Sequence, residues 1–307
     1  MSTAIYTHPA CLEHDPGPGH PESSARLAAV LEALDDPRFA SIVRIEAPAA
    51  TREQLARVHA PALIDEVLDE PVDAGWRRLD PDTVMSSASA DAALRAAGAV
   101  CAAVDAAIGG VHKRAFCAVR PPGHHATRDT AMGFCLFNSV AVGAAHAIAA
   151  HGLARIAIVD FDVHHGNGTQ DIFWSDPRVL YASSHQWPLY PGTGARTETG
   201  MGNIVNAPLQ PGSGSGEFRR ANEEIVLPAL EQFAPELVLI SAGFDAHKLD
   251  PLANLNLVAD DYAWITSRLV DLAERHAKGR VVSSLEGGYS LTALRESTAA
   301  HLCALTD

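Results

Sequence analysis

Two aspartates and two histidines stand within six residues of one another in the segment I-A-I-V-D-F-D-V-H-H, residues 156–165. Side chains two apart on a strand share one face, so we expect Asp160, Asp162 and His164 to point the same way. Burying two carboxylates together is costly unless a cation compensates their charge, and an aspartate with a histidine is a suitable pair of zinc ligands. The segment therefore predicts a metal site at the end of a strand.

Asp245 provides the third ligand, because it closes the apolar run L-V-L-I-S-A-G-F-D at residues 237–245. Three protein ligands leave one coordination position open for water, which distinguishes a catalytic zinc site from a closed structural one. Taken singly, a capping aspartate at a turn and a core histidine would explain these residues. Taken together among glycine-rich turns, they favour one catalytic zinc ion.

An adjacent pair of histidines offers proton transfer. His124 and His125 follow the rigid turn Pro-Pro-Gly at residues 121–123. Isolated pairs of this kind are usually surface accidents, but next to a metal one imidazole can take a proton from bound water while an amine leaving group receives one. Asp160 and Asn167 are expected to orient the imidazoles by hydrogen bonding to their ring nitrogens.

Tyr289 ends the motif L-E-G-G-Y, residues 285–289. The two glycines before it permit unusual backbone angles and free the ring to swing towards the site. A phenol hydroxyl there can donate to the oxygen of a tetrahedral intermediate. The alternative is an ordinary strand-to-helix turn with an aromatic ring packed on it, so this motif gains weight only beside the others.

Short runs rich in valine and isoleucine recur between helical stretches, and several are apolar on both faces, as covered parallel strands must be. The expected strands are Ile42–Ala47, Ala115–Val119, Ile156–Val163, Val179–Ser183, Val238–Ala242 and Val281–Leu285, and the expected helices are Glu22–Ala33, Ala88–Ile108, Ser139–Ala150, Phe218–Phe233 and Ala259–His276. This alternation predicts one α/β domain over residues 1–307 with a mostly parallel central sheet. Because four of the strands end in polar motifs, we expect those motifs to meet in one crevice at the carboxyl edge of the sheet.

Composition excludes several classes of function. The formal net charge of −14 disfavours binding to nucleic acid. The longest apolar-rich stretches, Ala96–Val104 and Ala141–Ala150, are too short to span a bilayer, and no signal-peptide pattern opens the chain. The five cysteines form no C-x-x-C pair, so neither a zinc ribbon nor a disulfide framework is indicated. We expect a cytoplasmic protein without a membrane partner, and the oligomeric state stays open.

Taken in order, these motifs resemble the histone deacetylase and acetylpolyamine amidohydrolase family, in the branch with asparagine at position 167. The likeness runs from H-P-E at residue 20 to the last helix. The motifs are R-P-P-G-H-H at 120–125, G-F-C-L-F-N at 133–138, D-x-D-x-H-H-G-N-G-T-Q at 160–170, Y-P-G-T-G at 190–194, S-A-G-F-D at 241–245 and L-E-G-G-Y at 285–289. The resemblance implies an arginase-like and deacetylase-like three-layer α/β sandwich, with one zinc ion on Asp162, His164 and Asp245.

The resemblance also implies roles for individual residues. Phe134 and Tyr190 would line a narrow tunnel for an acyl-lysine side chain, and Gly133 would accept a hydrogen bond from the scissile amide. His125 would act as general base and then acid, while His124, paired with Asp160, would remain mainly electrostatic. Tyr289 would polarise the acyl carbonyl.

A structural monovalent cation, commonly potassium, accompanies the zinc in this family. The resemblance places it on Asp160 and Ser183, with the backbone carbonyls of Asp162, His164 and Ser184 as further ligands.

Two positions separate this chain from relatives of the family. The arginases bind two manganese ions and have an aspartate two residues after the metal-binding histidine, whereas Gly166 stands here, so one metal is favoured, with His247 as the remaining candidate for a second. The acetylpolyamine-specific branch has an acidic residue in a D-P-E stretch, whereas this chain has Leu252 in D-P-L.

The leading hypothesis is therefore zinc-dependent hydrolysis of Nε-acyl-lysine in a protein or peptide. The alternative keeps the chemistry and changes the substrate to an acetylated polyamine or another small acylated amine, which an acidic residue at the tunnel mouth, such as Asp80 or Asp82, would support. A hypothesis of another class is a non-catalytic acyl-lysine-binding protein. Loss of a metal ligand or of Tyr289 would be its mark, and none is lost.

Overall fold

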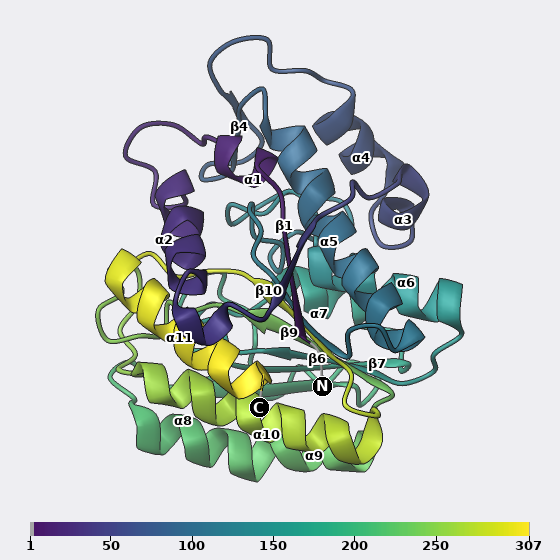
Figure 1. The fold of residues 1–307 in the computed structure, drawn as a ribbon, viewed down its shortest axis with the longest axis vertical. Coiled ribbons are helices and arrows are strands. Elements are labelled where there is room, and N and C mark those ends of the chain that lie inside the picture. The colour runs from purple at the N-terminus through teal and green to yellow at the C-terminus, as the bar shows by residue number, and fades with distance from the viewer. Residues whose placement is uncertain (1–2, 307) are drawn as a thin grey trace.

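Eight parallel strands form the central sheet of the computed structural model, which describes residues 3–306 (Figure 1). Their spatial order is β2-β1-β5-β10-β9-β6-β7-β8, and every neighbouring pair is parallel. The bounds are β1 Thr3–Thr7, β2 Val43–Glu46, β5 Arg114–Cys117, β6 Ile156–Asp160, β7 Val179–Gln186, β8 Ile204–Leu209, β9 Leu237–Ala242 and β10 Val281–Leu285. A separate antiparallel pair joins β3 (Arg77–Arg78) to β4 (Val84–Met85).

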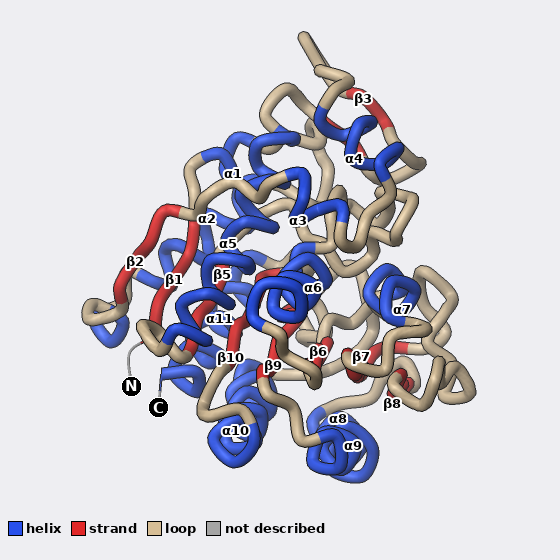
Figure 2. Tube along the Cα trace, turned by 90° about the vertical axis from the view of Figure 1, so that its right-hand side faces the viewer, coloured by secondary structure: helices blue, strands red, loops and turns tan. Residues whose placement is uncertain are grey.

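Helices cover both faces of the sheet, as Figure 2 shows. One layer holds α5 (Ser89–Gly109), α6 (Ser139–His151) and α7 (Asn167–Phe173). The other layer holds α8 (Ser215–Ala221), a π-helical turn (Asn222–Val226), α9 (Leu227–Phe233), α10 (Ala259–His276) and α11 (Leu291–Thr306). The remaining helices are α1 (Ala10–Glu13), α2 (Ser24–Leu34), a 3₁₀ turn (Pro37–Phe39), α3 (Arg52–Ala56) and α4 (Pro61–Leu68). The predicted three-layer α/β architecture with a mostly parallel sheet is confirmed.

The middle strands are buried along their whole length because a helix layer covers each face. Every residue of β6, β9 and β10 is buried, and most are valine, isoleucine, leucine or alanine. The continuous apolar runs predicted these strands correctly, since a strand covered on both sides has no polar face.

Helix α5 contains a longer apolar stretch than the one predicted from the sequence, Ala96–Val104. It has 21 residues, and an 18-residue stretch of it has a mean hydropathy of 1.5, so by length and composition alone it could cross a membrane, but 61% of that stretch is buried inside the fold. The expectation that no apolar stretch reaches spanning length is wrong for this helix. Its alanine-rich surface packs against α6 and the strands of the sheet, as a core helix does.

The sequence reading was wrong about the end of β6. We expected a strand from residue 156 to 163 or beyond, with alternating side chains, but β6 ends at Asp160. The Oδ1 atom of Asp160 accepts the N–H of Asp162 at 3.1 Å, and Oδ1 of Asp162 accepts the N–H of His164 at 2.9 Å. These local bonds replace the ladder of the sheet and turn the chain into a loop, so strand alternation does not bring these side chains together.

Candidate active site

Loops that follow four strands meet at the carboxyl edge of the sheet. The His124–His125 turn follows β5, the segment of Asp162 and His164 follows β6, Asp245 follows β9 and Tyr289 follows β10. In the sheet β5 lies beside β10, β10 beside β9 and β9 beside β6, so the four loops come from consecutive strands. The single crevice expected from the polar motifs is therefore present.

The three predicted metal ligands lie together, with the two aspartates in contact with the imidazole of His164. His164 Nδ1 lies 3.1 Å from Oδ1 of Asp162 and 3.0 Å from Oδ2 of Asp245. Their ligand atoms lie within 4.8 Å of one another, and both carboxylates are buried. Among residues 3–306, His247 does not join this group, because its Nδ1 instead accepts the N–H of Leu249.

The backbone around these carboxylates leaves room for little else. A Cβ atom on Gly243 would stand 1.9 Å from Oδ2 of Asp162, and one on Gly287 would stand 2.2 Å from Oδ2 of Asp245. The N–H of Gly287 donates to Asp162 Oδ2 at 2.8 Å, and the N–H of Val163 donates to Asp245 Oδ1 at 2.8 Å. Glycine is needed at positions 243 and 287 so that the chain can approach the two acids closely.

The charge of this group calls for a cation. Burial opposes protonation of His164, yet Asp162 and Asp245 raise the pKa of its imidazole to about 10. Burial, together with the charge of Asp162, raises the pKa of Asp245 to about 7. Two buried carboxylates thus stabilise positive charge here, and two aspartates with one histidine are ligands that suit zinc. The residues present fit a single divalent metal ion.

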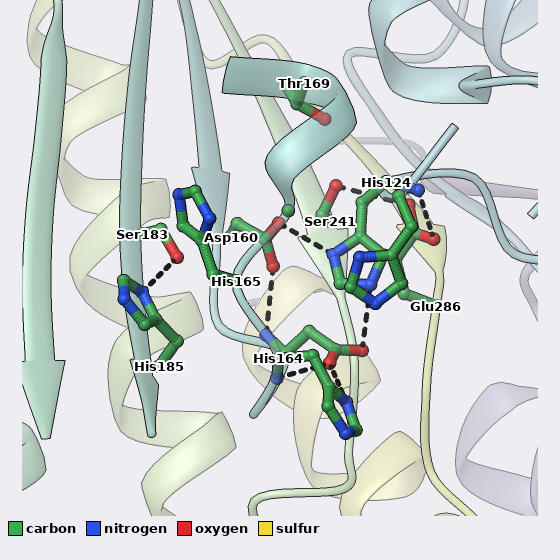
Figure 3. A network of polar contacts seen from close by, with 12 residues as sticks. His124, Asp160, His164, His165, Thr169, Ser183, His185, Ser241 and Glu286 are labelled. Atoms are coloured by element: carbon green, nitrogen blue, oxygen red, sulfur yellow. Dashed lines mark hydrogen bonds and ion pairs between the residues drawn. The ribbon is translucent and has the colours of Figure 1, made fainter. Parts of the chain in front are cut away.

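The two adjacent histidines differ in their partners. His124 Nδ1 lies 3.0 Å from Oδ2 of Asp160, as Figure 3 shows, and His125 Nδ1 lies 2.8 Å from Oδ1 of Asn167. Both contacts were predicted. The ring centroids of His125 and His164 are 5.9 Å apart, so the pair stands beside the metal ligands.

The surroundings of the two histidines shift their pKa values in opposite directions. Burial opposes protonation of His124, but the charges of Asp162 and Asp160 raise its pKa to about 10. Burial and the charges of His124 and His164 lower the pKa of His125 well below its ordinary value. These surroundings therefore favour the protonated form of His124 and the neutral form of His125, whose ring can then accept a proton.

Tyr289 is held from two sides. The carboxylate of Asp250 accepts the N–H of Tyr289 at 2.7 Å and that of Ser290 at 3.3 Å, and its other oxygen accepts the N–H of Leu252 at 3.1 Å. The guanidinium carbon of Arg26 lies 4.7 Å from the centroid of the Tyr289 ring. Burial raises the pKa of the Tyr289 hydroxyl well above its ordinary value, so this hydroxyl carries a proton to donate.

Arg26 also fastens the glycine turn before Tyr289. Its Nε donates to the carbonyl of Gly288 at 2.6 Å and its Nη2 donates to the carbonyl of Glu286 at 2.5 Å. Arg26 and Glu22 are buried and form an ion pair of 2.9 Å. The beginning of α2 thereby fixes the loop that carries Tyr289.

Glu286 is a residue of the site that sequence reasoning missed. One carboxylate oxygen accepts the N–H groups of Gly123 at 2.6 Å and His124 at 3.2 Å, and the other accepts the hydroxyl of Ser241 at 3.2 Å (Figure 3). This buried acid joins β9 and β10 to the histidine turn. A glutamate directly after a buried strand was the available signal.

Tyr181 and Asp250 were also missed. The hydroxyl of Tyr181 donates to Oδ2 of Asp160 at 3.0 Å and accepts the N–H of Gly166 at 3.0 Å. Asp160 therefore has two side-chain donors, Tyr181 and His124. No local sequence motif predicts these contacts, because Tyr181 lies inside an ordinary strand and Asp250 lies in a turn.

Comparison with known proteins decides the family. The family model of the histone deacetylase domain matches residues 20–305. The chain belongs to the histone deacetylase domain family. It is therefore a hydrolase of that family, and its membership implies an acetylated amine as substrate.

Several relatives in the family cover nearly the whole chain. Histone deacetylase 14, chloroplastic, from Arabidopsis thaliana is 41% identical, over 96% of this chain and 74% of its own length. The histone deacetylase-like amidohydrolase of Pseudomonas aeruginosa is 40% identical, over 94% of this chain and 82% of its own. The crystal structure of the HDA15 HD domain aligns with a TM-score of 0.94 at 37% identity, over 100% of this chain and 90% of that one. These matches confirm the predicted deacetylase-like fold.

The residues assigned by family resemblance to a tunnel lie around the histidines. The ring of Tyr190 stands 5.2 Å from that of His125, and the ring of Phe134 stands 5.9 Å from that of Tyr289. Phe134 has a φ of 68°, a conformation that its N–H supports by donating to Thr83 Oγ1 at 3.0 Å. One predicted tunnel residue therefore lies against His125 and the other against Tyr289.

Gly133 and Leu252 are the other two residues predicted to bind the substrate. Gly133 precedes Phe134, and its N–H donates to Oδ1 of Asp82 at 3.1 Å. Leu252 has 36% of its surface exposed, in the turn that Asp250 holds. The half-buried Asp82 thus lies beside the predicted substrate-binding residues, a contact that the sequence only suggested.

The residues assigned to a monovalent cation are also near one another. Asp160 and Ser183 are register partners in β6 and β7, and Ser184 is buried next in line. Within residues 3–306, no hydrogen-bond donor reaches the buried carbonyl oxygens of Asp162 or His164. Buried carbonyls without a donor fit a cation that prefers oxygen ligands.

Proposed function

We propose that this chain removes an acyl group, acetyl in the first instance, from the Nε-amine of lysine in a protein or peptide. We propose further that one zinc ion is held by Asp162, His164 and Asp245. When bound, zinc would lower the pKa of a coordinated water and polarise the acyl carbonyl. The observation that carries the proposal is the convergence of these three ligands beside His125, whose Nδ1 lies 2.8 Å from Oδ1 of Asn167 and whose ring centroid lies 5.9 Å from that of His164.

The residues of the chain then have distinct tasks. Because Nδ1 of His125 donates to Asn167, its Nε2 has a free lone pair and can take a proton from water and later deliver it to the departing amine. His124, charged and paired with Asp160, stabilises negative charge that develops on the substrate. The hydroxyl of Tyr289 donates to the acyl oxygen.

The tunnel residues place the substrate. Phe134 and Tyr190 would contact the alkyl chain of the acyl-lysine, and the carbonyl of Gly133 would accept the N–H of the scissile amide. A structural potassium ion is proposed on Asp160, Ser183 and Ser184 with the carbonyls of Asp162 and His164. Such an ion would compensate the buried charge of Asp160, whose pKa burial raises.

A small acylated amine is the second candidate substrate. Asp82 favours it, because a half-buried carboxylate beside Gly133 would attract the remaining ammonium group of an acetylated polyamine. Burial and the neighbouring Asp80 raise the pKa of Asp82, which weakens this attraction as the pH falls. The uncharged, partly exposed Leu252, at the position where the acetylpolyamine-specific branch has an acidic residue, suits the acyl-lysine substrate better.

The deciding experiment is turnover of a fluorogenic acetyl-lysine peptide and of acetylputrescine by protein of measured zinc content, with and without a chelator. We expect chelator-sensitive activity that favours the peptide. A preference for acetylputrescine that is lost in Asp82→Asn would reverse the choice of substrate. Zinc-loaded protein that turns over neither compound would contradict the proposal and favour a non-catalytic binding protein.

A further inference from the structure

A second group of aspartate and histidine lies on the helix layer, outside the active site. Asp105 is on α5, and His146 and His151 are near the carboxyl end of α6. Helix α6 leads directly into β6, so its last turn lies at the amino edge of the sheet, whereas the active site lies at the carboxyl edge. Nothing in the proposed deacylation uses these three residues.

The geometry of this cluster is that of ligands around one point. Oδ1 of Asp105 lies 2.7 Å from Nε2 of His146 and 2.6 Å from Nε2 of His151. The two rings are 5.7 Å apart between centroids and inclined by 82°, and the three ligand atoms lie within 4.8 Å of one another. Two ligands of one zinc ion stand roughly 3.4 Å apart, so small side-chain rotations admit a metal.

The cluster is open to solvent on one side. The side chains of Asp105 and His151 are 51% and 25% exposed, whereas that of His146 is only 9% exposed. A metal ion could therefore enter without opening the fold and keep water molecules at its other positions. We propose that Asp105, His146 and His151 form a second metal site, which takes a divalent transition metal ion such as Zn²⁺ and links α5 to α6.

Arg57 opposes metal binding because it holds His146 in the tautomer that cannot bind a metal through Nε2. Its Nη1 lies 2.8 Å from Nδ1 of His146, and since arginine only donates, Nδ1 accepts and Nε2 carries the ring proton towards Asp105. A metal on Nε2 requires the other tautomer, with the proton on Nδ1. Arg57 must then turn away, and its second partner Glu53, at 3.1 Å, keeps it on the surface.

The experiment measures Zn²⁺ binding by equilibrium dialysis and calorimetry, and thermal unfolding with one and with two equivalents of Zn²⁺. The wild-type chain should bind a second Zn²⁺ and melt at a higher temperature when it does. His151→Asn and Asp105→Asn should each weaken this second site by at least about tenfold and leave the first unchanged. Arg57→Gln should strengthen the second site by about tenfold, because a competing positive charge is removed.

A matched control uses the pair of His276 and Glu231, which has one imidazole 2.7 Å from an exposed carboxylate and no second histidine. His276→Asn should leave both Zn²⁺ equivalents unchanged. A second Zn²⁺ that binds wild type and His151→Asn equally would overturn the site. Equal affinity in wild type and Arg57→Gln would overturn the competition by Arg57. The active-site ligand change Asp245→Asn should remove the first equivalent and keep the second, which makes the result independent of the proposed deacylase function.

Discussion

The cluster at the carboxyl edge of the sheet and the cluster between α5 and α6 use the same side chains under opposite conditions. In the active site, two buried aspartates share one imidazole, and backbone N–H groups hold their remaining oxygens. Between the helices, one exposed aspartate accepts from two imidazoles, and Arg57 contacts the other nitrogen of His146. The contacts are 3.0 and 3.1 Å long in the active site and 2.6 and 2.7 Å long between the helices, so the cluster between the helices is at least as tightly drawn together.

Burial and backbone support make the difference. Loops from neighbouring strands fix the active-site acids before any ligand arrives, and desolvation strengthens every charge interaction there. Side chains on helix surfaces can rotate, and water screens their charges. We therefore expect large catalytic effects from changes at the sheet edge and small effects on stability from changes between the helices.

The largest difference in kcat is expected between two variants that each lose one histidine, His125 at the active site or His151 between α5 and α6. His125→Ala removes the proposed general base and should lower kcat by about 10³-fold, whereas His151→Ala should leave kcat unchanged. Turnover of an acetyl-lysine peptide at fixed zinc content provides the measurement, and thermal melts establish that both variants fold. Equal losses in the two variants would mean that the comparison is mistaken.

Tyr289→Phe removes a single donor from the active site and keeps its aromatic packing. We expect kcat to fall by about 10²-fold while the zinc content is unchanged, because the lost hydrogen bond acts on the charge that develops during the reaction. Steady-state kinetics with metal analysis on the same sample tests this. Full activity would exclude Tyr289 from the role of carbonyl donor.

Asp250→Asn tests whether Tyr289 depends on its backbone support. Both carboxylate oxygens of Asp250 accept backbone N–H groups, and the NH2 of asparagine would place a donor against one of these donors. Tyr289 should therefore shift, and kcat should fall by about tenfold. If Asp250 acts through Tyr289, the double variant with Tyr289→Phe should be no slower than Tyr289→Phe alone. If the losses in kcat of the two single variants multiply in the double variant, Asp250 does not act through Tyr289. Asp36→Asn, which alters an exposed carboxylate that accepts the N–H of Arg38 at 2.9 Å, is the control.

Buried neutral imidazoles away from both clusters predict how stability responds to acid. Burial lowers the pKa of His59 to about 4 and that of His301 to about 3, below the ordinary histidine value of 6.5. Between those values the unfolded chain binds protons that the native chain does not, so the free energy of unfolding should fall as the pH decreases below 6.5. His301→Asn should reduce the proton uptake on unfolding by about one. Denaturant melts from pH 7 to pH 4.5 give the slope, and parallel slopes for both chains would contradict the assignment.

The smallest effect is expected for Asp105→Asn in metal-free protein. Because the carboxylate is half exposed, its hydrogen bonds to His146 and His151 should contribute no more than about 1 kcal/mol to the free energy of unfolding. Urea unfolding in the presence of chelator measures this. A loss several times larger would show that the cluster is as structurally fixed as the active site.

Much of the fold was predictable because its signals are local. The apolar runs of β6, β9 and β10 and the periodicity of α6 and α10 can be recognised without knowing what covers them. Strands β1 and β8 were not predicted. Strand β8 lies at one edge of the sheet and contains partly exposed residues, and β1, second from the other edge, is a five-residue run with threonine at both ends. The predicted helix Phe218–Phe233 is present but begins earlier and contains a π-helical turn.

The sequence by itself determined which residues can do the chemistry, because the order of motifs places Asp162, His164, Asp245, His125 and Tyr289 after strands of one parallel sheet. Only the tertiary structure decided how they are used. It replaced the expected strand alternation with a loop of side-chain to backbone bonds, and it brought Glu286 and Asp250 to the backbone of the histidine turn and of Tyr289. The raised pKa of His124 and the lowered pKa of His125 have their causes in burial and in charges from distant segments, and such long-range electrostatics cannot be read from neighbours in the chain.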